Sequence, residues 1–420
     1  MACSTHERPP KEPAPAGAVV KREAPPPIVD RDRPIEAIHL EVNIKTRAAT
    51  ARLEINKSER DGGLTVEVGN LEIETVFDET GTLRFTHRDD RLDIGVPAGV
   101  ASVVVRYRFG IELQFDGAMP NGSTFTWPSY CGNLFPCRSR PKYGSRYTLA
   151  LSGLEEGETA VYPKSIPTAA PAYMVGWAVG KYQYKKLGKT RSGTEIGVYS
   201  VGAFNANFAG SEVVAAIDFF EKTIGPYAFG DSMGAVAVDW TGTSYEMVDH
   251  HPYWHIISGA AVVARNHIHQ AAHGWFGNGI RLKCWEDFVL SEGMAMYLTP
   301  RALEAAGNDA EPTWREYRTY LDQSIGWPAG CGKFDVQKEG LTSNAPYYKG
   351  AFFFRALEKK LGRAAFDKVL SSFYRENVGG QARGVADFLD HVEKKAGYDA
   401  GPCADEWLRE THAPADETCP

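Results

Sequence analysis

The chain has 420 residues, of which 43% are hydrophobic, 24% charged and 11% aromatic, and its formal net charge is −7 at pH 7. This is the composition of an ordinary globular protein, and the length suits two or three domains. The acidic balance and the lack of a Lys- or Arg-rich run give no basis for a nucleic-acid partner, and we expect none. No stretch approaches the about 18 consecutive apolar residues of a transmembrane span.

The first segment, residues 1–34, contains eight prolines and few large apolar residues, which predicts a disordered tether. Near its start lies Cys3, followed by the small polar Ser4. A cysteine in this setting resembles the start of a mature bacterial lipoprotein. We therefore expect a lipid anchor at Cys3 and a place in the bacterial cell envelope or periplasm. The alternative is a plain disordered tail on a secreted or cytoplasmic protein.

Apart from Cys3, six cysteines remain, an even number that can form disulfides in an oxidising compartment. Proximity in sequence suggests that Cys131 pairs with Cys137 and that Cys403 pairs with Cys419. The alternative is a set of scattered buried thiols.

Short segments between Ile38 and about Tyr199 alternate between apolar and polar residues. Examples are "HLEVNIKT", "LTVEVG", "RLDIGV" and "SVVVRYRF", which are separated by turn clusters such as "ERDGG" and "DETG". A period of two with regular turns is typical of antiparallel strands. The pattern predicts an N-terminal antiparallel β-sandwich or saddle domain over residues 35–200.

After Val201 the hydrophobic period lengthens. The segment "SEVVAAIDFFEKTIG" is a predicted amphipathic helix, with Ser211 as its N-cap and Gly225 beyond its end. A strand, "MGAVAVDW", follows, and then five more helical segments: "AAVVARNHIHQAAHGWFG", "SEGMAMYLTPRALEAAG", "YKGAFFFRALEKKLG", "AAFDKVLSSFYREN" and "VADFLDHVEKKAG". The chain is thus predicted to be α+β, with a mostly helical domain over residues 201–420.

The segment "NHIHQAAHGWFGNG" carries His269 and His273 one helical turn apart, so both point from one face of a helix. Such a pair is a weak signal alone, because histidines packed in a core can have the same spacing. Glu292 in "EDFVLSEGMAMY" follows His273 after 18 residues. Two imidazoles and one carboxylate leave one position of a tetrahedral zinc ion open, as in catalytic sites. The three residues predict one Zn²⁺ site.

The pattern from "HIHQAAHGWFGN" to "WEDFVLSEGMAMY" resembles the zinc signature of the aminopeptidase N and leukotriene hydrolase family, His-Glu-x-x-His-x18-Glu. The blocks "LFPCRSRPKYGSRYTLAL" and "APYYKGAFFFRALEKKLG" also resemble that family, in the same order. The resemblance implies a thermolysin-like zinc peptidase domain that removes residues from peptides with a free N-terminus. The family's large C-terminal helical domain does not follow, which suggests a minimal two-domain form.

The resemblance also assigns roles to single residues. Tyr347 in "PYYKG" matches the tyrosine that stabilises the oxyanion, with Tyr348 as its competitor and a candidate for substrate binding. Glu246 in "GTSYEMVD" falls near the position of the family's glutamate that binds the substrate amine. Asp249 is the alternative candidate for this role. Trp127 occupies the position where many relatives carry a substrate-binding Gln or Glu.

Neighbouring positions are expected to have supporting roles. His250, His251 and His267 are interpreted as surface residues or as partners of the ligands. Met296 lies one helical turn after Glu292, so no carboxylate at that position can orient the ligand.

One position departs from the signature, because Gln270 stands where the family has a glutamate. In the family mechanism that glutamate takes a proton from the zinc-bound water and passes it to the leaving amine. An amide cannot accept this proton, and the loss is on the order of 10²–10⁴ in rate. Zinc binding should survive, since this residue is not a ligand.

Two origins fit the glutamine at position 270. One is a deliberate Glu→Gln substitution, and the other is a natural pseudo-peptidase of the cell envelope that binds peptides without cutting them. The complete set of metal ligands favours the first origin. The segment around Glu246 keeps little of the family's sequence apart from the glutamate, which favours the second. On balance we favour a substituted aminopeptidase.

Overall fold

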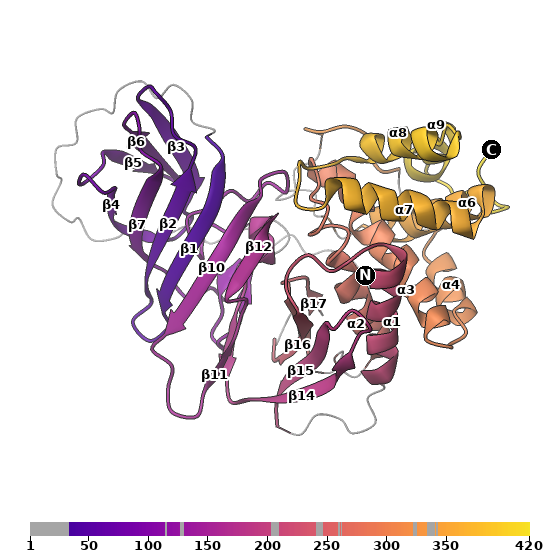
Figure 1. Ribbon diagram of the computed structural model, residues 1–420, viewed down its shortest axis with the longest axis horizontal. Helices are drawn as coiled ribbons and strands as arrows, with labels where there is room; N and C mark the ends of the chain where they lie inside the picture. The colour runs from indigo at the N-terminus through magenta and orange to yellow at the C-terminus, as the bar shows by residue number, and fades with distance from the viewer. Residues whose placement is uncertain are drawn as a thin grey trace.

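The computed structural model describes residues 33–113, 116–126, 130–202, 210–240, 247–258, 261, 263–321, 326–333, 341 and 343–420. Figure 1 shows a β-rich part, formed by the first strands, beside a part in which helices cover a second sheet. Within these described ranges, no helix has both the length and the apolar character needed to cross a bilayer.

The β-rich part contains a six-stranded sheet in the order β12-β10-β1-β2-β7-β4 and a three-stranded sheet in the order β3-β6-β5. Its strands alternate between buried and exposed residues as the sequence predicts. The strands are β1 (Ile35–Asn43), β2 (Ala48–Ile55), β3 (Gly62–Glu67), β4 (Glu72–Phe77), β5 (Phe85–Arg88), β6 (Arg91–Val96), β7 (Ser102–Arg108), β10 (Ser145–Ser152) and β12 (Ser165–Ala170). All pairings in these two sheets are antiparallel except β1 with β10, which run parallel from Ala37↔Arg146 to Asn43↔Ser152.

Two short pairs complete this part, β8 (Gly117–Ala118) with β9 (Thr124–Phe125) and β11 (Thr159–Val161) with β13 (Ala178–Gly180). A single 3₁₀ turn, η1 (Ala172–Met174), lies between β12 and β13.

The second part is built on a five-stranded sheet in the order β14-β15-β16-β18-β17. Its strands are β14 (Tyr182–Lys189), β15 (Glu195–Val201), β16 (Ser232–Val238), β17 (Met247–Val248) and β18 (Tyr253–Ile257). The sequence division at residue 200 placed β14 and β15 with the N-terminal domain, but β15 pairs in parallel with β16. Strand periodicity is the same in both sheets, so it does not reveal which sheet a strand joins.

Helices cover this sheet and extend beyond it (Figure 1). They are α1 (Gly210–Thr223), α2 (Ala264–His273), η3 (Trp285–Leu290), α3 (Glu292–Ala305), α4 (Glu311–Arg318), η5 (Ala345–Lys349), α6 (Gly350–Leu361), α7 (Arg363–Asn377), α8 (Val385–Ala396), α9 (Gly401–Ala404) and η6 (Asp405–Arg409). All six helical segments predicted from the sequence contain a helix. The expected N-cap of α1 was wrong, because this helix already includes Gly210 and Ser211 lies inside its first turn. A side chain at Gly210 would meet Leu187 of β14, so the glycine lets the helix start against the sheet.

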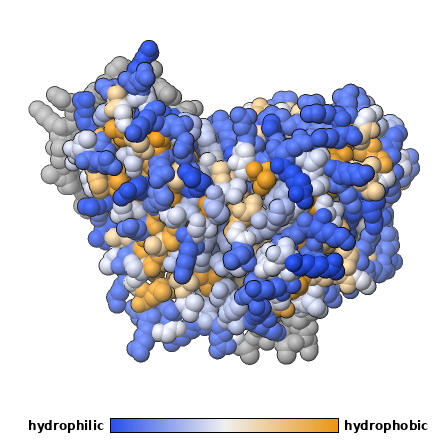
Figure 2. Space-filling view, viewed as in Figure 1, coloured by the Kyte–Doolittle hydropathy of each residue, from blue (hydrophilic) through white to orange (hydrophobic). Residues whose placement is uncertain are grey.

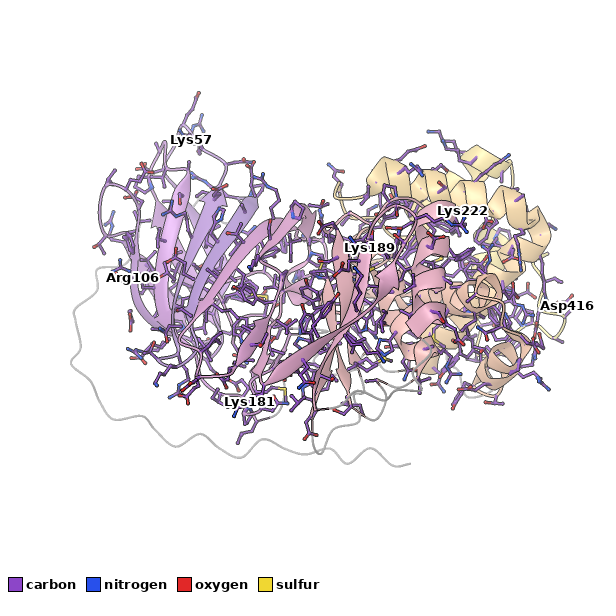
Figure 3. All side chains as sticks on the ribbon, turned by 60° about the horizontal axis from the view of Figure 1, so that its bottom comes forward. Lys57, Arg106, Lys181, Lys189, Lys222 and Asp416 are labelled. Carbon is purple, nitrogen blue, oxygen red and sulfur yellow. A yellow bond between two sulfur atoms is a disulfide. The ribbon has the colours of Figure 1, made fainter. Side chains whose placement is uncertain are left out.

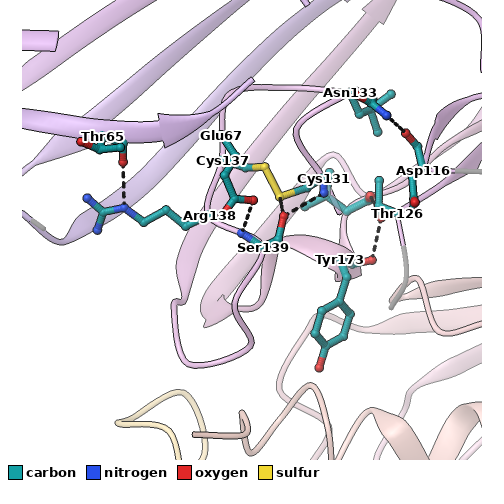
Figure 4. The surroundings of a disulfide bond; sticks show 12 residues. Thr65, Glu67, Asp116, Thr126, Cys131, Asn133, Cys137, Arg138, Ser139 and Tyr173 are labelled. Carbon is teal, nitrogen blue, oxygen red and sulfur yellow. Dashed lines mark hydrogen bonds between the residues drawn. A yellow bond between two sulfur atoms is a disulfide. The ribbon is translucent and has the colours of Figure 1, made fainter. Parts of the chain in front are cut away.

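Three disulfides link the six cysteines beyond Cys3: Cys131–Cys137, Cys284–Cys331 and Cys403–Cys419. The first and third are the pairs expected from proximity, whereas the second joins residues 47 positions apart. Around the first pair, the Cys131 amide donates to the Ser139 hydroxyl and the Ser139 amide donates to Glu67 of β3 (Figure 4). The loop between β9 and β10 is therefore fixed to the three-stranded sheet.

The two parts meet next to the predicted zinc helix. The Tyr173 hydroxyl, from η1, donates to the carbonyl of Gly277 at 2.8 Å, four residues after His273. Arg281 donates from Nη1 to the carbonyl of Ala169 and from Nη2 to that of Gly380. These contacts hold the turn after α2 against the β-rich part.

Buried histidines form the rest of this junction. His250 Nδ1 lies 2.9 Å from the carbonyl oxygen of Tyr173, and His255 Nδ1 lies 3.1 Å from that of Thr124. Burial lowers the pKa of His250 to about 4, and it also lowers that of His255. Both rings are therefore neutral at pH 7 and donate one hydrogen each to backbone of the other part.

The outer surface is largely polar. On the face drawn in Figure 2, hydrophobic residues gather only in small separate patches among hydrophilic ones. Figure 3 shows the charged side chains of Lys57 and Asp416 at the outline of the molecule. This is the usual mixed surface of a protein face in contact with water.

Candidate active site

The three predicted metal ligands lie together. His269 and His273 point from one face of α2, and Glu292 is the first residue of α3. The His269 Nε2 lies 3.1 Å from Glu292 Oε2 and 3.3 Å from His273 Nε2, and His273 Nε2 lies 3.5 Å from the same carboxylate oxygen. The three donor atoms thus form a nearly equilateral triangle.

The size of this triangle suits zinc. Ligands about 2.0–2.2 Å from a tetrahedral zinc ion are separated from each other by about 3.2–3.6 Å. All three distances fall in or next to this interval. Two nitrogens and one oxygen are also a common donor set of catalytic zinc, with a fourth position left for water or substrate.

The turn between α2 and α3 needs a glycine. Gly277 has a φ of 109°, and a β carbon at this position would lie 2.4 Å from the Ser291 hydroxyl. Ser291 itself lies with its Oγ 3.2 Å from Nδ1 of His273. The close packing at Gly277 therefore brings the residue before Glu292 to the outer nitrogen of a ligand, which helps to set the orientation of that ring.

A second close approach fixes the start of α3. A β carbon on Gly293 would lie 2.7 Å from the Pro346 carbonyl oxygen and 2.9 Å from Cα of Gly350. The reverse also holds, since a β carbon on Gly350 would lie 2.8 Å from Cα of Gly293. The backbone beside Glu292 thus touches both ends of the segment that carries Tyr347.

His273 and Glu292 each shift the pKa of the other toward its charged form. Burial alone would raise the pKa of Glu292, but His273 and His269 outweigh it and lower this pKa to about 2. Burial would likewise lower the pKa of His273, and Glu292 with Asp249 instead raises it to about 9. A metal ion at this position would therefore meet an ionised carboxylate and would displace a proton from His273.

Asp249 lies beside this centre. It is buried, and neither carboxylate oxygen has a hydrogen-bond partner within the described part of the chain. Burial is the main reason that its pKa rises to about 7, and His273 opposes the rise. A carboxylate buried next to a ligand is better placed to support that ligand than to bind a substrate amine, the reserve role that the sequence suggested.

Gln270 follows His269 on α2 and is buried. Its backbone carbonyl oxygen lies 3.0 Å from Nε2 of His251, which fixes this turn of the helix. Its side-chain oxygen is buried without a hydrogen-bond partner among the described residues. Since buried polar atoms rarely stay unpaired, this oxygen marks a place for a water or a substrate group.

The side chains of the two candidate tyrosines, Tyr347 and Tyr348, pack against different neighbours. Both belong to the π-helical turn η5, a geometry that is frequent at functional sites. Tyr347 packs edge-on against Phe288 of η3, the turn that leads to Glu292, with ring centroids 5.8 Å apart. Tyr348 stacks on Tyr320 beyond α4 at 4.5 Å. The structure therefore favours Tyr347 for the position next to the metal.

Two site predictions lie outside the described residues. These are Glu246, just before β17, and Trp127, just after β9 and Thr126. His250, His251 and His267 were expected to be surface residues or partners of the ligands, and their burial excludes the first alternative. Their ring nitrogens are within hydrogen-bonding distance of backbone carbonyls, which hydropathy patterns in the sequence do not reveal.

Sequence reasoning also missed two residues near the ligands. Ser291 contacts His273, and its position directly before Glu292 is the only signal in the sequence that could have identified it. Arg265 lies one helical turn before His269, and this spacing was visible in the sequence.

We predict that alanine at His269 or His273, or glutamine at Glu292, lowers zinc affinity by more than about 100-fold, because each change removes a direct ligand, and loss of outer partners alone costs about 10–100-fold. Zinc content after dialysis, measured by atomic emission, should fall from one equivalent to near zero. His412→Ala serves as the control, since His412 is exposed. Equal zinc loss in the control, or no zinc in the unchanged chain, would contradict the site.

Comparisons with known proteins match the part of the chain that carries these residues. Residues 256–407 match the model of the peptidase family M1 domain. Aminopeptidase N of Lactococcus lactis subsp. lactis is 22% identical over 441 residues, which cover 90% of this chain and 51% of that protein. The chain thus spans about half the length of this curated relative.

Solved structures share the fold. One is a mutant of the M1 zinc metallopeptidase from Deinococcus radiodurans bound to a Tyr-Ser-Ala substrate, with a TM-score of 0.78, 15% identity and coverage of 91% of this chain and 95% of that one. Another is yeast LTA4 hydrolase, with a TM-score of 0.74, 19% identity and coverage of 94% and 72%. Residues 256–407 thus match a peptidase family M1 domain, in a chain that has the two-part fold of M1 zinc metallopeptidases.

Proposed function

We propose that this chain is built as a zinc-dependent aminopeptidase for short peptides with a free N-terminus, and that Gln270 leaves it strongly impaired. The observation that carries the proposal is the triangle of His269, His273 and Glu292 donor atoms directly beside a buried glutamine. A triangle that matches zinc supports metal-dependent hydrolysis. The amide at the next position supports the loss of the general base.

Each residue has a distinct task in this proposal. A zinc ion held by the three ligands would polarise the scissile carbonyl and lower the pKa of a water. Gln270 can orient that water by a hydrogen bond, but its amide cannot accept a proton. Tyr347 donates its hydroxyl to the oxygen that gains negative charge during the reaction. Glu246 is the proposed partner of the substrate amine, and Trp127 and Tyr348 are proposed to contact the substrate.

A second candidate is a natural peptide-binding protein of the cell envelope without catalytic activity. It is favoured by Gln270 itself and by three disulfides, which form in oxidising compartments such as the periplasm. A lipid anchor at Cys3 belongs to the same proposal. The two candidates differ in whether the rest of the catalytic machinery still works.

We predict that Gln270→Glu raises the rate of aminoacyl-arylamide and tripeptide hydrolysis by about 10²–10⁴, because it restores a general base where only that group is missing. Release of the N-terminal residue should be followed by chromatography, with and without a chelator. The matched control is the double change His269→Ala and Gln270→Glu, which keeps the new carboxylate but loses a ligand. A peptide that binds both forms of residue 270 and is cut by neither would support the non-catalytic candidate.

In the Gln270→Glu background, Tyr347→Phe should lower kcat by about 10²–10³ with little change in KM, because one oxyanion donor is lost. Tyr348→Phe is the matched control, since its ring stacks on Tyr320 away from η3. We expect it to change kcat by less than about 5-fold, because a substrate contact away from the oxyanion acts mainly on KM. The opposite ranking of the two variants would show that the roles of the tyrosines are exchanged.

A further inference from the structure

The face of α2 that carries the metal ligands continues toward the surface. Arg265, His269 and His273 are spaced by four residues, so they form one row along the helix. The exposed fraction of the side chain rises along this row from 2% at His273 to 11% at His269 and 34% at Arg265. The more open end of the row is therefore the N-terminal end of α2, where Arg265 lies.

The Arg265 guanidinium uses only part of its hydrogen-bond donors within the described residues. Its Nη1 donates to Glu316 of α4 at 2.5 Å. Because Arg265 lies one helical turn before His269 on α2 and bonds to α4, its side chain extends from the metal-binding helix toward α4. Among the described residues, Nε and Nη2 have no hydrogen-bond partner. A guanidinium has five donors, so most of them remain for a ligand.

The surroundings of Arg265 favour an anion. The N-terminal end of α2 carries the partial positive charge of the helix, and its first turn receives no side-chain cap from Val263. On the facing side, Tyr317 and Tyr348 pack edge to face at 5.5 Å and offer apolar surface. A guanidinium binds a planar anionic group such as a carboxylate through two parallel hydrogen bonds.

The orientation of a bound peptide decides which of its carboxylates reaches Arg265. The described neighbours of the proposed amine-binding positions are Thr126, which bonds to the Tyr173 carbonyl in the β-rich part, and Met247, which pairs with Ile256 of β18. Arg265 instead faces α4, so it would meet the other end of a bound peptide. One helical turn from His269 is about 6 Å, and an extended peptide covers about 3.5 Å per residue. Arg265 could therefore contact the first or second residue after the scissile bond.

We propose that Arg265 is a specificity-determining residue that binds a carboxylate on the leaving side of the scissile bond, so that the site prefers di- and tripeptides with a free C-terminus. This inference rests on the proposed peptide site. A competing explanation is that the Arg265–Glu316 pair only ties α2 to α4. Exposed ion pairs of that kind contribute little to stability, and they would not discriminate between peptide ends.

The test is equilibrium binding to the zinc-loaded chain, which can be measured because Gln270 slows cleavage. Calorimetry would compare Ala-Ala-Ala with its C-terminal amide and with Ala-Asp-Ala amide. We expect the free acid to bind about 10–100-fold more tightly than the amide, the effect of one charge-assisted hydrogen-bonded pair. A gain for Ala-Asp-Ala amide over Ala-Ala-Ala amide would identify a side-chain carboxylate as a second source of the same interaction.

Arg265→Gln should reduce the acid-to-amide ratio to about one while leaving binding of the amide unchanged. Arg315→Gln is the matched control, because it removes the same charge from an exposed residue next to Glu316, and it should keep the ratio. Arg265→Lys keeps the charge and should retain part of the preference, which covers the case in which the glutamine variant does not fold.

The other outcomes separate this inference from the proposed function. Equal binding of acid and amide to the unchanged chain overturns the role of Arg265 but leaves the peptide site intact. A preference that persists in Arg265→Gln also overturns it, because the carboxylate is then bound elsewhere. If none of the peptides binds to the zinc-loaded chain, the proposed function fails as well.

Discussion

The contact between the backbones of Gly293 and Gly350 is the constraint on which the geometry of this site depends. Neither residue has room for a β carbon, so α3 begins directly against the junction of η5 and α6. Glu292 precedes one of these glycines, and Tyr347 lies three residues before the other. A helix–helix distance set by side chains would separate the ligand from the tyrosine by several ångströms more. The placement of Glu292 relative to the segment that carries Tyr347 is thus a consequence of backbone packing.

In the proposed function, the centre keeps the framework of a zinc peptidase and lacks only its general base. Ser291 and Asp249 still lie next to His273, the ligands keep distances that suit zinc, and only the residue that would move the proton is an amide. A glutamate and a glutamine have almost the same shape, so the fold is insensitive to this difference. Binding of metal and peptide can therefore persist without catalysis, which is the property that both proposed functions share.

The ligands could be predicted from the sequence because they need little long-range information. The row of His269 and His273 is local to one helix, and Glu292 begins the next α-helix along the chain. The Cys284–Cys331 bond, the pairing of β15 with β16 and the burial of His250 depend on segments that meet only in three dimensions. Periodicity identified these segments as strands or helices but contains no information on their partners.

The most direct test of the central claim is anomalous diffraction at the zinc edge from crystals grown with zinc. We predict one peak bound by Nε2 of His269, Nε2 of His273 and a carboxylate oxygen of Glu292, each about 2.0–2.2 Å from the ion, with the Tyr347 hydroxyl facing the remaining position. A peak at another place, or refined donor atoms too far apart to share one ion, would contradict the account.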